Sequence, residues 1–279
     1  MFGNQYLSGV NTLVTFVGVA LGCGTSEASL FTYNDFSDVS NLTFVTSATT
    51  YENRLRLNGT GNNNSGAVWT KDKHTVAYGF KTTYSFRIGE QTQGPGSDVL
   101  EFYVQNYAAD AIYYKSFNDP EEGTILEDDF LRIQIDTYQN AWDNNNWHLE
   151  VKDFNELTND DRYNNLGLAD LPGTKNSDLH DITVEYTFET TQLVISFDGT
   201  QLLDIDYDLA ANMTLDNGQA YVGFIASSGA VAETHDVFTW SWESNDANPV
   251  PEPAAIAVWS ALGLFGVGFG LRRKYRKSA

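Results

Sequence analysis

The stretch Gln134–Val151, QIDTYQNAWDNNNWHLEV, is the part of this chain that decides its fold. It begins with the alternation of a β-strand, passes into a run of Asn and Asp, and returns to strand-like sequence at His148. Side chains two positions apart in a strand share a face, so Gln134 and Asp136 project the same way. A metal-binding loop, a cleft and an ordinary polar turn all fit this pattern, and the rest of the chain has to distinguish them.

Oxygen donors dominate this loop, which favours a hard cation. Calcium takes about six to eight oxygens from carboxylates, amides, main-chain carbonyls and water. The predicted calcium ligands are the Asp136 carboxylate, the Tyr138 carbonyl, the Asn140 amide and the Asp143 carboxylate. The loop is not an EF-hand, because Ala141 and Trp147 stand where that motif requires glycine and glutamate. For this segment alone, a solvated Asn/Asp turn remains the alternative.

His148 adds a nitrogen donor, which suits Mn²⁺ or another transition ion better than calcium. Such a second ion would share Asp136 and Asp143 and take His148 as its nitrogen ligand. Gln134 stands where a third carboxylate is expected, and a neutral amide weakens this second site. The residues therefore predict a calcium site and a weaker site for the second metal.

Composition points to an all-β sandwich or barrel. The 279-residue chain contains 14 % aromatic residues and 23 glycines, and short runs of Val, Ile, Thr, Tyr and Phe alternate with Asn, Asp and Gly clusters. The net charge is −21, although five of the 16 basic residues lie within residues 272–277. Such an acidic domain argues against nucleic acid and anionic lipid as partners, and suits divalent cations and neutral polymers.

The N-terminus predicts export. Leu13–Leu21 is a short apolar run followed by small residues, typical of a signal peptide covering residues 1–28. No Lys or Arg precedes it, so the usual basic start of such a peptide is missing. Cys23, the only cysteine, lies in a sequence that loosely resembles a lipobox, and we expect it to leave with the signal peptide. The mature domain, residues 29–245, then has no disulfide.

The C-terminal segment, residues 246–279, predicts a membrane anchor. Ala254–Leu271 is uncharged and mostly apolar, marginally long enough for one transmembrane helix. The basic cluster after it keeps the tail in the cytoplasm and places the domain outside. With Val250–Pro253, VPEP, this order resembles the PEP-CTERM sorting signal of Gram-negative bacteria. The resemblance implies transient anchoring in the inner membrane, processing by an exosortase, and a final location at the cell surface or outside the cell. A plain membrane anchor is the alternative.

Four further stretches, together with the opening one, resemble the legume-type (L-type) lectin family in that family's order. They are GAVWTKDKHTVAYGFKTTYSFRI (66–88), GSDVLEFYVQN (96–106), LVISFDGTQLL (193–203) and AYVGFIASSGAVAETHDVFTWSW (220–242). The similarity spans nearly all of residues 30–243. It implies a concanavalin A-like jelly-roll sandwich of two antiparallel sheets, in which Ile182, Val184, Tyr186 and Phe188 face the space between sheets.

The resemblance also assigns roles in sugar binding. Asp98 matches the aspartate that accepts hydrogen bonds from two sugar hydroxyls. Asn140 matches the residue that gives its oxygen to calcium and its NH₂ to the sugar, and Tyr138 matches the aromatic ring that lies against the pyranose. Gly229 and Ala230 lie in the matching variable loop, Ser228–Ala232, which sets sugar preference in the family. The implied function is an exported, calcium-dependent protein that binds a carbohydrate or exopolysaccharide without catalysis.

Several positions depart from the family pattern. Val99 replaces the glycine expected after the key aspartate, and residues 107–130 are acidic and aromatic rather than glycine-rich. A structural matrix protein that keeps the metal but not the sugar site is therefore one alternative function. A glycoside hydrolase is another, but Asp204, Asp206 and Asp208 fit the wet outer face of a strand better than a catalytic pair. Single sugar contacts of about 0.1–1 mM need multivalency, so a homo-oligomer is also among the expected assemblies.

The remaining candidates are expected to be structural. His235 opens a closing strand and is predicted to have a structural role, whereas His74 and His180 are expected at the surface. Trp142, Trp240 and Trp242 are expected in the core.

Overall fold

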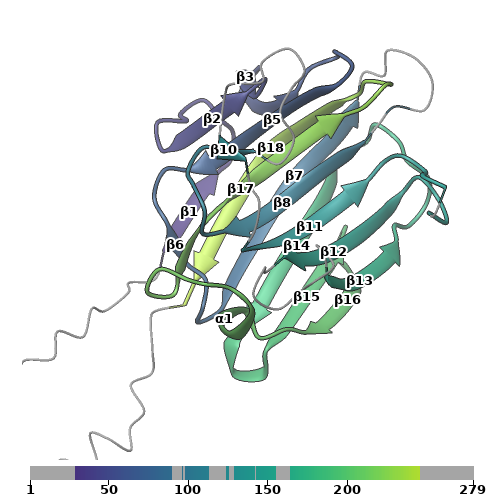
Figure 1. Cartoon of the computed structure of the whole chain (residues 1–279). Coiled ribbons are helices and arrows are strands. Elements are labelled where there is room, and N and C mark those ends of the chain that lie inside the picture. Colours follow the sequence, from purple (N-terminus) through teal and green to yellow (C-terminus); the bar gives the residue numbers. More distant parts are fainter. Residues whose placement is uncertain are drawn as a thin grey trace, which may run out of the picture.

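Two eight-stranded antiparallel sheets face each other in the protein (Figure 1). The computed structural model describes residues 29–89, 96, 98–112, 124–125, 129–141, 143–154 and 164–245. We call the sheet that contains the stretch quoted above the front sheet, and its partner the back sheet. The expected sandwich of two antiparallel sheets is confirmed.

The front sheet runs, in spatial order, β13 (Asn164–Asp170), β12 (His148–Phe154), β11 (Phe130–Asp136), β8 (Val99–Gln105), β17 (Gln219–Ser228), β5 (Asn64–Thr70) and β2 (Leu42–Thr46), with β6 (His74–Thr75) also on β17. The back sheet runs β16 (Thr200–Asp206), β15 (Gln192–Phe197), β14 (His180–Thr187), β7 (Phe80–Gly89), β18 (Thr234–Ser244), β4 (Arg54–Asn58) and β3 (Thr49–Tyr51), with β1 (Leu30–Tyr33) also on β18. Four short elements complete the described fold: the parallel pair β9 (Ala111–Ile112) and β10 (Thr124–Ile125), the 3₁₀ turn η1 (Phe188–Thr190) and the helix α1 (Leu209–Asn212).

Strand alternation fills the space between the sheets, with one exception. In β14, Ile182, Val184 and Tyr186 are buried as predicted. The prediction for Phe188 is wrong: β14 ends at Thr187, the chain turns into η1, and the Phe188 side chain is 37 % exposed. The alternation rule fails there because it holds only while the backbone stays extended.

Large aromatic side chains dominate the core. Trp240 and Trp242 are fully buried, as predicted, and the Trp240 ring meets the Phe224 ring edge-on at 4.8 Å. Tyr84 of the back sheet contacts Phe224 of the front sheet at 5.0 Å, so the two sheets interlock through rings. Trp142 lies outside the described residues.

A second, smaller apolar cluster lies on the opposite face of the front sheet. Trp69, Tyr103, Phe130 and Ile225 are fully buried there, and the Trp69 indole N–H donates to the Ala111 carbonyl at 2.7 Å. The short strand β9 therefore covers this part of the sheet, and only the remaining part of that face is available for polar groups.

The two ends of the described domain meet. Ser244, at the end of β18, and Ser29 are joined through their hydroxyls at 2.8 Å and through a main-chain bond of 3.0 Å. Among the described residues, no helix is long and apolar enough to cross a membrane. The predicted signal peptide, Cys23, the VPEP motif and the 254–271 span lie outside those residues.

Candidate functional site

Strand register brings three separate loops together at one end of the front sheet. Asp136, the last residue of β11, pairs with His148 on one side and with Val99 on the other. Val99, which directly follows Asp98, also pairs with Ser227 near the end of β17. The Asp98 turn, the loop 137–147 and the loop 229–233 are therefore neighbours (Figure 1, at the end to which the β11 arrow points).

The loop 137–147 carries a compact group of metal-ligand atoms. Oxygens of Asp136 and Asp143 and a ring nitrogen of His148 all lie within 4.8 Å of one another. The Tyr138 N–H donates to Oδ1 of Asp136 at 2.8 Å, and the Asn140 N–H donates to Oδ2 of Asp143 at 2.7 Å. The structure therefore brings together the ligand atoms of Asp136, Asp143 and His148, and these two bonds hold the main chain of Tyr138 and Asn140 beside the carboxylates.

Burial makes this cluster electrostatically unfavourable on its own. Burial, followed by the nearby Asp143 and Glu150 carboxylates, raises the pKa of Asp136 to about 6, although the Tyr138 N–H and His148 act in the opposite direction. Two carboxylates this close repel each other, and a divalent cation between them would offset their charge. The donor set fits one hard cation.

A second cation fits poorly, because Gln134 is already engaged. Its side-chain N–H donates to Oδ2 of Asp136 at 3.1 Å, the same oxygen that lies 3.9 Å from Nε2 of His148. The Gln134 amide thus places an N–H group against the Asp136 oxygen that a second cation would need as a ligand. The carboxylates on the neighbouring strands are paired as well, since Glu101 contacts Arg132 at 3.2 Å and Glu150 contacts Lys152 at 2.5 Å. Within the described part of this cluster, Asp136 and Asp143 are the two carboxylates left for metal ions, and their charges balance one divalent ion rather than two.

Asp98 and Gly229 lie in contact. A Cβ atom added to Gly229 would come within 2.6 Å of Oδ2 of Asp98, so only glycine lets the carboxylate lie against the chain there. The Asp98 N–H donates to the Ser227 carbonyl at 3.0 Å, and Ala230 follows on the exposed surface. Tyr138 is 38 % exposed, which leaves part of its side chain accessible.

A neighbouring turn supports this loop, and no sequence pattern predicted that contact. The Asn63 N–H donates to the Gly229 carbonyl at 2.8 Å, and the Ser228 hydroxyl donates to the Gly61 carbonyl at 2.9 Å. The asparagine-rich turn before β5 is therefore part of the structure that supports this loop.

A buried network beneath the site was also missed. Glu233 is fully buried, and its carboxylate contacts Lys175 at 2.6 Å and the Thr137 hydroxyl. Lys175 comes from the connection between β13 and β14, which carries no recognisable motif. The only available signal was the acidic residue of ETHD, and its sequence neighbours do not reveal its partners.

The histidines outside the loop differ partly from expectation. His235 is buried and bonds Oδ1 of Asn58 at 2.8 Å, as its structural assignment predicts. His180 is not a free surface residue, since its ring nitrogens contact Asp198 at 2.8 Å and Asn176 at 3.0 Å. His74 is half-buried, and burial lowers its pKa to about 4. Both surface predictions failed because aromatic rings lie against these side chains. Phe31 and Trp242 contact His74, and Phe197 and Trp147 contact His180.

Asp204 and Asp206 are exposed in β16, while Ile205 between them is buried. Asp208 caps α1 by accepting from the Ala211 N–H at 3.1 Å. These aspartates therefore occupy an outer strand face and a helix cap, as the sequence suggested.

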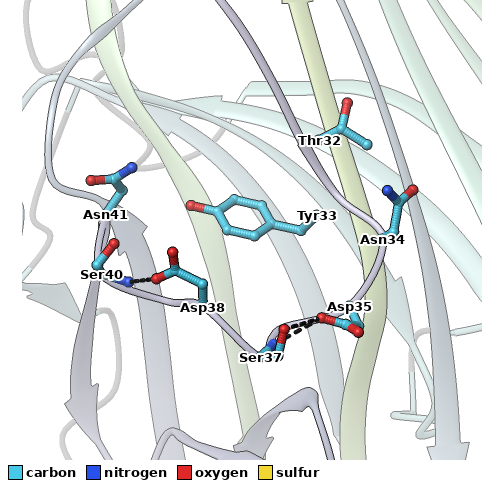
Figure 2. A pocket seen from close by; sticks show the side chains of 8 residues that line it. All are labelled: Thr32, Tyr33, Asn34, Asp35, Ser37, Asp38, Ser40 and Asn41. Atoms are coloured by element: carbon cyan, nitrogen blue, oxygen red, sulfur yellow. Dashed lines mark hydrogen bonds between the residues drawn. The ribbon is translucent and has the colours of Figure 1, made fainter.

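A hollow of about 400 Å³ lies beside β1, away from these residues, and Figure 2 shows the side chains that line it. Its carboxylates close the local turn: Asp35 accepts from the Ser37 hydroxyl at 2.6 Å, and Asp38 accepts from the Ser40 N–H at 3.0 Å. The Tyr33 ring in the middle of the view stacks on Phe36 at 5.2 Å. The hollow contains none of the predicted site residues, and its polar groups are used within the turn.

Two antiparallel sheets with a carboxylate- and histidine-lined loop beside an aspartate turn define a concanavalin A-like sandwich. The profile of the legume lectin domain matches residues 28–256, and the chain belongs to that family. Curated relatives include a lectin from Glycine max and a seed lectin from Styphnolobium japonicum, each 26 % identical over 64 % and 63 % of this chain. The matched part spans 61 % and 60 % of those two proteins.

Solved structures of lectins share the fold. A winged bean acidic lectin complexed with methyl-α-D-galactose superimposes with a TM-score of 0.62 at 20 % identity, covering 80 % of this chain and all of that one. Arcelin-5, a lectin-like defense protein from Phaseolus vulgaris, gives 0.61 at 16 % identity, covering 78 % of this chain and 99 % of that one.

Proposed function

We propose that this protein binds carbohydrate reversibly, through a site that one calcium ion holds in shape. The observation that carries the proposal is the convergence of Asp98 and Gly229 with the Asp136–Asp143 cluster at one end of the front sheet. Family membership supports the same conclusion.

The chemistry of each group suits this role. Asp98 offers a carboxylate that accepts hydrogen bonds from sugar hydroxyls, and Asn140 and Tyr138 would contact the same sugar from the metal loop. Calcium would join Asp136, Asp143, Asn140 and the Tyr138 carbonyl, and it would supply the positive charge that offsets the two carboxylates. The contribution of these residues is to bind and orient, and no covalent step is needed.

Glycan-array binding of the domain 29–245 tests the proposal directly. Galactosides are the first probes, because a similar solved lectin is complexed with methyl-α-D-galactose. We expect a signal that EDTA abolishes, that calcium restores, and that Asp98→Ala removes. The matched control is Asp204→Ala, which deletes an exposed carboxylate on β16 of the back sheet and should bind as the wild type does. Binding that survives both EDTA and Asp98→Ala would refute the proposal.

A structural protein with a metal-stapled lectin fold is the second candidate. Arcelin-5, described as lectin-like, shares the fold, so the sandwich alone does not carry sugar binding. Val99 and the acidic segment 107–130 are departures that favour this candidate. It predicts that calcium raises the melting temperature while no glycan on the array is retained.

We also propose export to the cell surface or the extracellular space of a Gram-negative bacterium, with the tail anchored and then processed. Support comes from the segments 1–28 and 246–279, and from the position of the domain ends. Ser244 lies at the far end of β18 from Glu233, and a strand of 11 residues spans about 36 Å. A tail leaving from Ser244 would hold the sugar site away from a membrane. Fractionation and the intact mass of the mature protein would test this location.

A further inference from the structure

Glu233 lies where the three loops of the site meet, and its carboxylate has a partner in each direction. Lys175 contacts Oε2 at 2.6 Å, and the Thr137 hydroxyl and Nε2 of His235, at 3.4 Å, face Oε1. A Cβ atom on Gly96 would come within 2.1 Å of Oε2, so the chain just before Asp98 passes directly against this carboxylate. We call Glu233, Lys175 and Thr137 the Glu233 network.

Thr137 connects the network to the sugar-binding turn. Its N–H donates to the Asp98 carbonyl at 2.8 Å, and its hydroxyl oxygen lies 2.9 Å from that carbonyl. A hydroxyl has one proton, and the ionised Glu233 is the stronger acceptor. Thr137 also lies between Asp136 and Tyr138 in the chain, so its position determines the positions of these two predicted metal ligands.

Lys175 joins the network from a fourth segment, the connection between β13 and β14. Its ammonium group donates both to Glu233 and to the Thr137 carbonyl, the latter at 3.2 Å, and its side chain is only 8 % exposed. Glu233 is buried, which raises its pKa, but His235, Lys175 and Thr137 more than reverse this, so its pKa lies below the usual value. Glu233 therefore favours its charged form inside the protein, 2.6 Å from the side-chain nitrogen of Lys175.

A buried ion pair is an energetically unfavourable way to fill the interior of a protein. Removing two charges from water is unfavourable, and apolar side chains of similar volume usually stabilise a core equally well or better. Hydrogen bonds from a fixed charge to several loops, however, define their relative positions, which apolar packing does less well. Sugar sites built on loops need such ordering, because each group left mobile loses entropy on binding.

We propose that the buried Glu233–Lys175 ion pair is the positioning element of the sugar site, which fixes the Asp98 turn, the metal loop and the loop 229–232 relative to one another. Neither residue touches the sugar in this arrangement. The proposal rests on the proposed carbohydrate-binding function and adds to calcium a second, internal support for the same surface.

The test compares Lys175→Met, Glu233→Gln and the double variant with the wild type at saturating calcium. Each single variant should lower the melting temperature, because Lys175→Met leaves a buried charge uncompensated and so does Glu233→Gln. The double variant removes both charges and should recover most of that loss. Its affinity for the sugar should nevertheless stay at least 10-fold below that of the wild type.

Asp236→Asn is the matched control. Asp236, like Glu233, is a buried carboxylate, and it lies in β18. Its partners Arg54 and Arg56, at 2.9 Å each, belong to β4 and not to the site loops. This variant should lose stability and keep wild-type affinity. Equal affinity losses in Asp236→Asn and the double variant, or wild-type affinity in the double variant, would overturn the proposal.

Amide hydrogen exchange provides a readout that needs no sugar. In the double variant, the N–H groups of Thr137 and Asp98 should exchange at least 10-fold faster, while those of β14 and β15 keep wild-type rates. If the wild type binds no glycan at all, the carbohydrate function fails and this exchange result still decides the positioning role. Unchanged exchange at Thr137 and Asp98 would reject that role.

Discussion

Replacing Gly229 with alanine should weaken sugar binding without unfolding the protein. The new methyl carbon would lie 2.6 Å from Oδ2 of Asp98, whereas ordinary contacts begin at about 3.4 Å. The carboxylate or the loop must therefore move by close to 1 Å. Gly229 does not have a left-handed backbone, so alanine brings no conformational strain of its own.

The size of the effect follows from the geometry of a charged hydrogen bond. A carboxylate displaced by about 1 Å loses at least one of its bonds to sugar hydroxyls, and a bond to a charged group contributes about 1.5–3 kcal/mol. The dissociation constant should therefore rise by roughly 10- to 100-fold. Stability should change little, because the site lies at the edge of the fold.

Isothermal titration with the best array ligand, at saturating calcium, measures this change, and thermal unfolding checks the fold. Gly59→Ala is the control, since its added Cβ would meet only Asn64 Nδ2 at 3.8 Å. Wild-type affinity in Gly229→Ala would show that Asp98 does not bind the sugar from the position seen here. A large loss of stability would instead show that the loop itself is part of the folding core.

Three further outcomes are expected. Gln134→Glu should add a second metal ion per protein, because it replaces the amide donor beside Asp136 with a carboxylate. Elemental analysis after dialysis against Ca²⁺ and Mn²⁺ measures the gain, and His148→Ala in the same background should abolish it. An unchanged ratio of one ion per protein would contradict this account. In metal-free protein the raised pKa of Asp136, from 3.8 to about 6, means that the folded state binds a proton more tightly than the unfolded state. The free energy of unfolding should thus fall by about 3 kcal/mol as the pH rises from about 4 to above 6, and calcium should remove the decline. Urea unfolding in the presence of EDTA measures this pH dependence, which should be absent in Asp136→Asn. Trp69→Ala should cost about 3–5 kcal/mol, since it empties the second cluster and frees the Ala111 carbonyl; a change below 1 kcal/mol would mean that β9 contributes little to the fold.

Local patterns were enough to predict the class of fold and the composition of the metal loop. Alternation in β14 predicted Ile182, Val184 and Tyr186 as core residues, and failed at Phe188 only where the strand had ended. The oxygen-rich run after Gln134 predicted the residues that the structure gathers, because ligand type and strand period are visible within a few positions.

Contacts between side chains from distant loops were not predictable in this way. The hydrogen bond from Gln134 to Asp136 depends on the conformations of two side chains on the same face of β11. The sequence showed only that residue 134 lacks the negative charge of a glutamate. The partners of His180 come from the residues 176 and 198, which no spacing rule connects to it.

The amino-acid sequence by itself determined the sandwich, the acidic loop and the residue types available for a cation and a sugar, because strand period and turn chemistry are short-range properties. Only the tertiary structure decided that Lys175 reaches Glu233, that Gly229 lies against Asp98, and that one carboxylate pair remains for metal. Those contacts join segments whose separation is set by the register of β8, β11 and β17, and register is settled when the two sheets pack, not by any single strand.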